Sequence, residues 1–200
     1  MTRPAVLMTG AYPAWYLEEW AARYRLLKLW EAPHPEAFVA AHAAEVRAIA
    51  SRGDLGAAAA LMRALPKLEI VACFGVGTDA IDLAHAKAAG VRVTNTPDVL
   101  TDDVADLAVG LLLATARQIP QGDAHVRDGS WASGPMPRVT RVSGKAVGVV
   151  GLGRIGAAVA ERLAGFDADI AYFARGPGRT RPGLTSTTSS RWRGARSSCS

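Results

Sequence analysis

Three glycines with the spacing GxGxxG lie in the segment Gly151-Leu152-Gly153-Arg154-Ile155-Gly156. The segment connects an apolar run at 146–150 to residues with helical spacing at 157–163, as a strand-to-helix turn requires. In such a turn the first glycine permits the tight bend, the second leaves room for a diphosphate, and the third lets helix and strand pack closely. The sequence therefore predicts that these six residues bind a dinucleotide at a helix N-terminus, the alternative being a plain turn.

The next predicted strand, Asp169–Phe173, ends at Ala174-Arg175, where the ribose of a dinucleotide is expected. NAD-binding proteins usually place an acidic residue there, about 20 residues after the glycines. Asp169 enters the strand too early for this role, whereas the planar guanidinium of Arg175 suits a 2′-phosphate. We therefore predict that Ala174 and Arg175 contact the cofactor and that NADP is favoured over NAD. The alternative is that Arg175 begins a basic tail.

The elements that position these residues are short apolar runs alternating with alanine-rich segments of helical spacing. Strands are predicted at 5–8, 25–29, 46–49, 68–74, 91–94, 146–150 and 169–173, and helices between them at 16–23, 35–43, 56–65 and 82–89. This alternation predicts an α/β fold with parallel sheets covered on both faces.

A longer helix is predicted from Thr101 to about Gln118. The Thr101 hydroxyl is expected to cap its first turn, and Asp102 and Asp103 complement the positive end of the helix dipole. Its apolar stripe is broad, so we expect it to be buried between domains or between subunits.

Composition places the chain among soluble globular proteins, because 50% of its residues are apolar and 20% are charged. Residues 176–200 contain five arginines and no acid, which accounts for the net charge of +5. Because this segment has no periodic apolar face, we predict a disordered basic tail. The run 104–116 is too short to span a bilayer, and Cys73 and Cys199 suggest no disulfide framework or metal site, so a cytoplasmic protein is expected.

The residues around a second glycine turn resemble the D-isomer-specific 2-hydroxyacid dehydrogenases. The resemblance lies in residues 74–82, 90–106, 117, 127–131 and 144–145, and continues into the glycine loop at 151–156. The segment 95–106 is most similar to the glyoxylate, hydroxypyruvate and hydroxyphenylpyruvate reductase branch, which is commonly NADPH-linked. The resemblance implies an incomplete flavodoxin-like substrate domain at 1–98, then a partial Rossmann NAD(P)-binding domain with the interdomain helix at 99–175, and last the tail at 176–200.

The resemblance also implies site residues. The backbone at Val76 and Gly77 would contact a substrate carboxylate, since a glycine turn after a strand exposes free amides as an anion nest. Leu100 would lie near the substrate and Val104 near the nicotinamide. For Val76 and Gly77 the alternative is a plain structural turn.

The family's catalytic arginine, glutamate and histidine come after the second strand of the cofactor domain, and none has a counterpart in this sequence. We therefore assign no catalytic residue and no metal ligand. The histidines present are predicted to be surface residues because none is paired with a carboxylate in a recognised context: His34, His42, His85 and His125. The change of composition after Arg175 suggests an altered reading frame or a truncation.

Two functional hypotheses follow from the resemblance. The first is a reductase that converts small 2-keto acids such as glyoxylate or hydroxypyruvate to D-2-hydroxy acids by hydride transfer, forming a homodimer through its cofactor domain. The second is a non-catalytic dinucleotide-binding fragment. A nucleic-acid-binding role for the arginine tail is disfavoured, since without stacking aromatics it would give only weak, salt-sensitive attraction.

Overall fold

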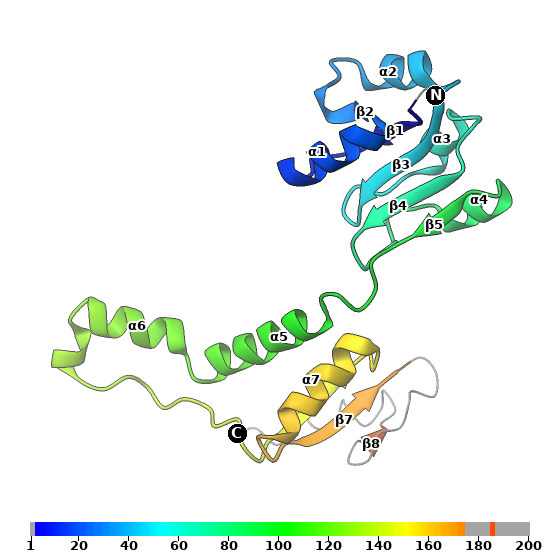
Figure 1. Cartoon of the computed structure of the whole chain (residues 1–200). Coiled ribbons are helices and arrows are strands. Elements are labelled where there is room, and N and C mark those ends of the chain that lie inside the picture. Colours follow the sequence, from blue (N-terminus) through cyan, green and yellow to red (C-terminus); the bar gives the residue numbers. More distant parts are fainter. Residues whose placement is uncertain (1–2, 175–184, 187–200) are drawn as a thin grey trace. The chain divides into compact units, whose positions relative to one another are not determined.

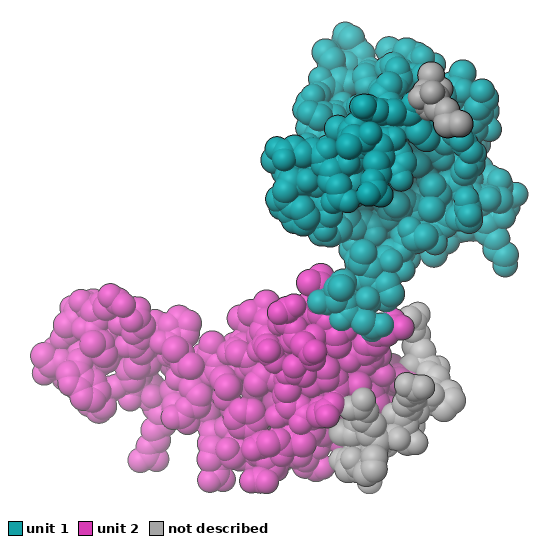
Figure 2. Space-filling model, viewed as in Figure 1, with its two compact units in different colours: residues 1–99 teal, residues 100–200 magenta. Residues whose placement is uncertain are grey.

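The chain divides into two compact units, Met1–Val99 and Leu100–Ser200 (Figure 2). The computed structural model describes residues 3–174 and 185–186. Each unit has its own sheet and its own apolar core.

The first unit is built on a five-stranded parallel sheet of order β2-β1-β3-β4-β5 (Figure 1). Its strands are β1 (Ala5–Met8), β2 (Arg25–Lys28), β3 (Val46–Arg52), β4 (Ile70–Phe74) and β5 (Arg92–Thr94). This is the strand order of flavodoxin-like folds, which confirms the predicted fold class. All five strands coincide with predicted apolar runs, with ends that differ by up to three residues.

Four helices and one short 3-10 turn connect these strands: α1 (Ala14–Arg23), η1 (Leu29–Glu31), α2 (Pro35–His42), α3 (Ala59–Arg63) and α4 (Leu83–Ala88). One core cluster joins Leu7, Ile49 and Val71 of the strands to residues of α2, α3 and α4. A second cluster joins Val6 and Met8 to residues of α1. Successive strand residues point to opposite faces, so the two clusters lie on the two faces of the sheet.

The second unit contains the first part of a Rossmann fold. Its elements are α5 (Thr101–Ala116), α6 (Ile119–Arg127), η2 (Ser130–Ser133), β6 (Ala146–Val150), α7 (Arg154–Ala164), β7 (Asp169–Phe173) and β8 (Thr185–Ser186). The strands form a parallel sheet of order β6-β7-β8, and α7 provides the crossover from β6 to β7. This arrangement confirms the predicted βαβ unit around the glycine loop.

The structure corrects the predicted start of α5. Leu100, and not Thr101, occupies the N-cap position, and no side chain caps the helix there. The Leu100 carbonyl accepts the first intrahelical bond from the amide of Val104 at 3.0 Å, so Thr101 is already helical. Asp102 and Asp103 do lie in the first turn, as predicted.

Within the described residues, Ala105 is the buried residue of α5, and Leu107 and Leu111 of its apolar stripe are 61% and 57% exposed. In the described part of the chain, these two leucines of the stripe are therefore exposed and not buried as the sequence analysis expected. The predicted disordered tail, 176–200, falls outside the described residues except for Thr185–Ser186, which form β8.

Candidate functional site

The glycine loop joins β6 to α7 as the sequence predicts. Helix α7 begins at Arg154, three residues before its predicted start at Ala157. Gly151 has a φ of 94°, a conformation that favours glycine at this bend. Its amide donates to the carbonyl of Phe173 at 2.7 Å, which ties the loop to the end of β7. The loop and Ala174 are therefore brought to the same edge of the sheet, where the carboxyl ends of β6 and β7 lie.

The other two glycines differ in what surrounds them. A Cβ on Gly153 would meet nothing within 4 Å, so the space above it is open. A Cβ on Gly156 would overlap the carbonyl oxygen of Gly151 and lie 3.3 Å from Cγ1 of Val149. Gly153 therefore leaves room for a ligand, whereas Gly156 is needed for the close approach of helix and strand.

The N-terminus of α7 presents unpaired backbone amides. Gly153 is the N-cap, no side chain caps the helix, and the first intrahelical bond runs from Ala157 to the Gly153 carbonyl at 2.9 Å. Within the described residues, the amides of Leu152, Gly153, Ile155 and Gly156 have no hydrogen-bond acceptor. Together with the positive end of the helix dipole, these donors make a binding site for phosphate oxygens.

Helix α7 is held by α5 beside it. Arg162 donates to Asp102 at 3.0 Å and also forms an ion pair with Asp106, and both carboxylates belong to α5. Apolar side chains of both helices share one cluster with β6 and β7, including Val109, Leu112 and Val159. These contacts fix the direction of α7 and hence the direction of its free amides.

A second set of free amides follows β4. Gly75 has a φ of 150°, and the chain turns there towards Val76 and Gly77. The amides of Val76 and Gly77 have no acceptor in the part of the chain that the structure describes. This geometry is that of an anion nest at the carboxyl end of a parallel strand.

The thiol of Cys73 lies beneath this turn and donates to the carbonyl of Gly77, with 3.6 Å between the two atoms. Burial, with a smaller contribution from the charge of Asp54, raises the pKa of Cys73. The thiol therefore remains protonated at neutral pH and acts as a hydrogen-bond donor within the fold.

The predicted site residues fall in both units. Val76 and Gly77 belong to the first unit, whereas the glycine loop, Leu100, Val104 and Ala174 belong to the second. Leu100 and Val104 lie at the start of α5 and are 48% and 38% exposed. Arg175 lies outside the described residues.

Two of the four histidines have local side-chain contacts in the described structure. Nε2 of His125 lies 2.9 Å from the carbonyl oxygen of Gly134, and Nδ1 of His42 lies 2.6 Å from Oε1 of Glu45.

Among the described residues, no group of three His, Cys, Asp or Glu side chains is arranged to hold a metal ion. In the same residues, no helix combines the length and the apolar character needed to cross a membrane.

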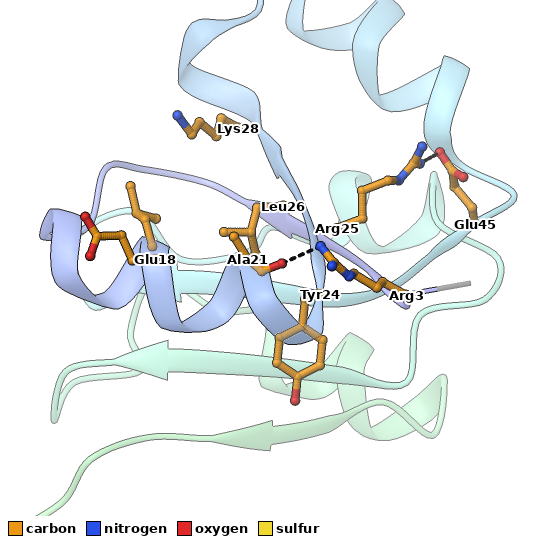
Figure 3. Close-up of a pocket in the computed structure, with 9 residues that line it drawn as sticks. Arg3, Glu18, Ala21, Tyr24, Arg25, Leu26, Lys28 and Glu45 are labelled. Atoms are coloured by element: carbon orange, nitrogen blue, oxygen red, sulfur yellow. Dashed lines mark hydrogen bonds and ion pairs between the residues drawn. The ribbon is translucent and has the colours of Figure 1, made fainter. Parts of the chain in front are cut away.

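A groove of about 740 Å³ lies elsewhere on the first unit, between α1 and the edge strand β2 (Figure 3). Its arginines have partners, since Arg3 donates to the carbonyl of Ala21 at 2.7 Å and Arg25 forms an ion pair with Glu45. Arg3 precedes β1 and Arg25 begins β2, which places them at the amino ends of the strands. Ligands of open parallel sheets bind at the carboxyl ends, so we assign no site to this groove.

Comparison with known proteins decides the family. The sequence profile of the D-isomer specific 2-hydroxyacid dehydrogenase catalytic domain matches residues 7–198. The chain belongs to this family of oxidoreductases. The resemblance inferred from the sequence is thereby confirmed.

Individual relatives agree with this assignment. A hydroxyphenylpyruvate reductase from Plectranthus scutellarioides is 50% identical over 170 residues, which is 85% of this chain and 54% of the relative. The structure of a 2-hydroxyacid dehydrogenase from Ketogulonicigenium vulgare Y25 matches with a TM-score of 0.86 at 47% identity, covering 94% of this chain and 59% of that chain.

An NADPH-dependent glyoxylate/hydroxypyruvate reductase from Sinorhizobium meliloti, in complex with NADP and malonate, matches with a TM-score of 0.76 at 38% identity and covers 93% of this chain and 57% of that one. The chain thus spans a little over half the length of the relatives it matches.

Two residues that sequence reasoning missed contact the Val76–Gly77 turn. The side chains of Asn95 and Thr96, which follow β5, form hydrogen bonds to its backbone. Two features of the sequence could have pointed to them. They directly follow β5, the strand next to β4, and they lie within the segment 90–106 that resembles the dehydrogenase family.

Substituting Gly156 tests the packing of the loop. We expect Gly156→Ala to destabilise the second unit by about 1–3 kcal/mol, because its Cβ would overlap the Gly151 carbonyl. Gly153→Ala should change stability by less than about 0.5 kcal/mol, since its Cβ enters open space. Urea unfolding followed by circular dichroism measures both. Equal stability of the two variants would contradict the close approach of α7 to β6.

Proposed function

We propose that this chain binds NADP(H) through its glycine loop, and that the protein is a reductase of small 2-keto acids such as glyoxylate or hydroxypyruvate, forming D-2-hydroxy acids. The observation that carries the proposal is the uncapped N-terminus of α7, with open space above Gly153 and the tight turn at Gly151. The names of the relatives support the substrate class.

In this proposal the diphosphate lies on the backbone of the segment Gly151-Leu152-Gly153-Arg154-Ile155-Gly156. Gly153 provides the space, and the amides of Leu152, Ile155 and Gly156 provide donors that need no reorganisation on binding. When bound, NADPH supplies the hydride. The bond from the Gly151 amide to Phe173 keeps the loop beside Ala174, where the ribose is expected.

The substrate carboxylate is proposed to bind the free amides of Val76 and Gly77. A carboxylate accepts such hydrogen bonds more strongly than a neutral oxygen does, so the turn selects anionic substrates. Leu100 is proposed to contact the substrate and Val104 the nicotinamide. Residues 1–98 would then be the substrate-binding domain, and 99–175 part of the cofactor-binding domain.

The preference for NADP over NAD is proposed from Arg175, whose guanidinium would pair with the 2′-phosphate. The NADPH-dependent relative from Sinorhizobium meliloti supports this preference. A homodimer and a cytoplasmic location are proposed on the family resemblance and on the sequence.

A second candidate is a dinucleotide-binding fragment without catalysis. It is proposed because no residue of the given sequence is recognised as a counterpart of the family's catalytic arginine, glutamate and histidine. Both candidates require NADPH binding, and they differ in whether hydride is transferred.

Turnover separates the two candidates. If the chain is the fragment, NADPH fluorescence should report binding while glyoxylate and hydroxypyruvate cause no oxidation of NADPH. Turnover by the purified chain would support the reductase. If neither binding nor turnover occurs, both candidates are wrong for this chain.

Replacing Arg175 tests the cofactor preference. We expect Arg175→Ala to weaken NADPH binding about tenfold or more and to leave NADH binding unchanged, because one charge-assisted hydrogen bond to the 2′-phosphate is lost. Arg117→Ala removes an exposed arginine elsewhere in the second unit and controls for net charge. Parallel loss of affinity for both cofactors would argue against a 2′-phosphate contact.

A further inference from the structure

The turn after β4 has all three of its carbonyls engaged. The Gly75 carbonyl accepts from the amide of Thr96 at 3.0 Å, and the Val76 carbonyl accepts from Nδ2 of Asn95 at 2.8 Å. The Gly77 carbonyl accepts from the Cys73 thiol. The acceptors of the turn are therefore held within the fold, while the amides of Val76 and Gly77 have no acceptor among the described residues.

The engaged carbonyls determine where the free amides point. In a planar trans peptide the C=O and the following N–H point in opposite directions, and the described residues contain no cis peptide bond. The Thr96 amide fixes the Gly75 carbonyl and thereby turns the Val76 amide away from β5. In the same way, the Asn95 side chain fixes the Val76 carbonyl and turns the Gly77 amide outward.

Thr96 makes a further contact at the start of the turn. Its Oγ1 accepts from the amide of Gly75 at 3.1 Å, so Thr96 binds both polar groups of that residue. On the other side, the Gly53 amide donates to the carbonyl of Phe74 at 3.3 Å. The turn is therefore held between the loop after β3 and the two residues after β5.

The register of the sheet explains why these residues are in reach. Thr94 pairs with Ala72 in the parallel ladder between β4 and β5. Two residues further along each strand, Thr96 lies beside Phe74 and Gly75, at the carboxyl end of the sheet. Asn95 is exposed, so water would satisfy its amide equally well, and core packing does not require its contact with Val76.

We propose that Asn95 and Thr96 are positioning residues, which orient the amides of Val76 and Gly77 towards the substrate carboxylate. The proposal rests on the proposed function, because it takes this turn to be the carboxylate site. Neither side chain needs to touch the substrate. The Asn95 side chain holds the peptide group that carries the Gly77 amide, and the Thr96 hydroxyl holds the Gly75 amide at the start of the turn, so that little reorganisation occurs on binding.

The test is an oxalate titration of the full chain, followed through the amide NMR signals of Val76 and Gly77. Oxalate carries a carboxylate next to a second carbonyl carbon, as 2-keto acids do. We expect both signals to shift in the wild type, and Asn95→Ala and Thr96→Val each to weaken oxalate binding about tenfold with unchanged melting temperature.

Two further variants control for other effects. Thr96→Ser keeps the hydroxyl and should restore wild-type binding. Thr94→Val removes an exposed threonine hydroxyl from the neighbouring strand residue and should have no effect.

The outcomes separate the two proposals. If oxalate shifts neither Val76 nor Gly77 in the wild type, the turn is not a carboxylate site and the proposed function fails at this point. If the wild type binds and Asn95→Ala and Thr96→Val bind equally well, the positioning role is wrong while the carboxylate site stands. If Thr96→Ser binds oxalate as weakly as Thr96→Val does, the proposed role of the hydroxyl is also wrong.

Discussion

Both candidate sites depend on backbone amides that have no acceptor among the described residues, at points where the chain leaves a parallel strand. After β6 the amides belong to the first turn of α7, and after β4 they belong to the turn at Val76 and Gly77. Such backbone donors favour anions, which suits a diphosphate at one site and a carboxylate at the other.

Free amides are useful only if their direction is fixed, and the two units fix it differently. In the second unit the direction of the amides is fixed by the position of the whole helix α7. Gly156 lies against the Gly151 backbone, and Arg162 forms ion pairs with two carboxylates of α5. In the first unit it is fixed by hydrogen bonding, since Asn95 and Thr96 hold the polar groups of the turn. The packing of α7 leaves no room for a side chain at Gly156, whereas the exposed Asn95 can be changed without disturbing a core.

Much of the fold could be predicted from the sequence because strands and helices alternate with clear apolar periods. The glycine loop was predictable for the same reason, since its spacing and its place between strand and helix both restrict the backbone. The N-cap of α5 was not, because a threonine followed by two acids looks like a cap, yet Leu100 takes that position. Asn95 and Thr96 were missed because their role depends on the register between β4 and β5, which no local pattern encodes.

The open space above Gly153 is proposed to receive the diphosphate of NADPH. The most direct measurement is a fluorescence titration of NADPH into the wild type, Gly153→Ala and Gly110→Ala. Gly110 is a suitable control because a Cβ there also meets nothing within 4 Å but lies within α5. We expect saturable binding by the wild type and Gly110→Ala, and binding weakened about tenfold or more by Gly153→Ala. Equal affinity of all three proteins would contradict this proposal.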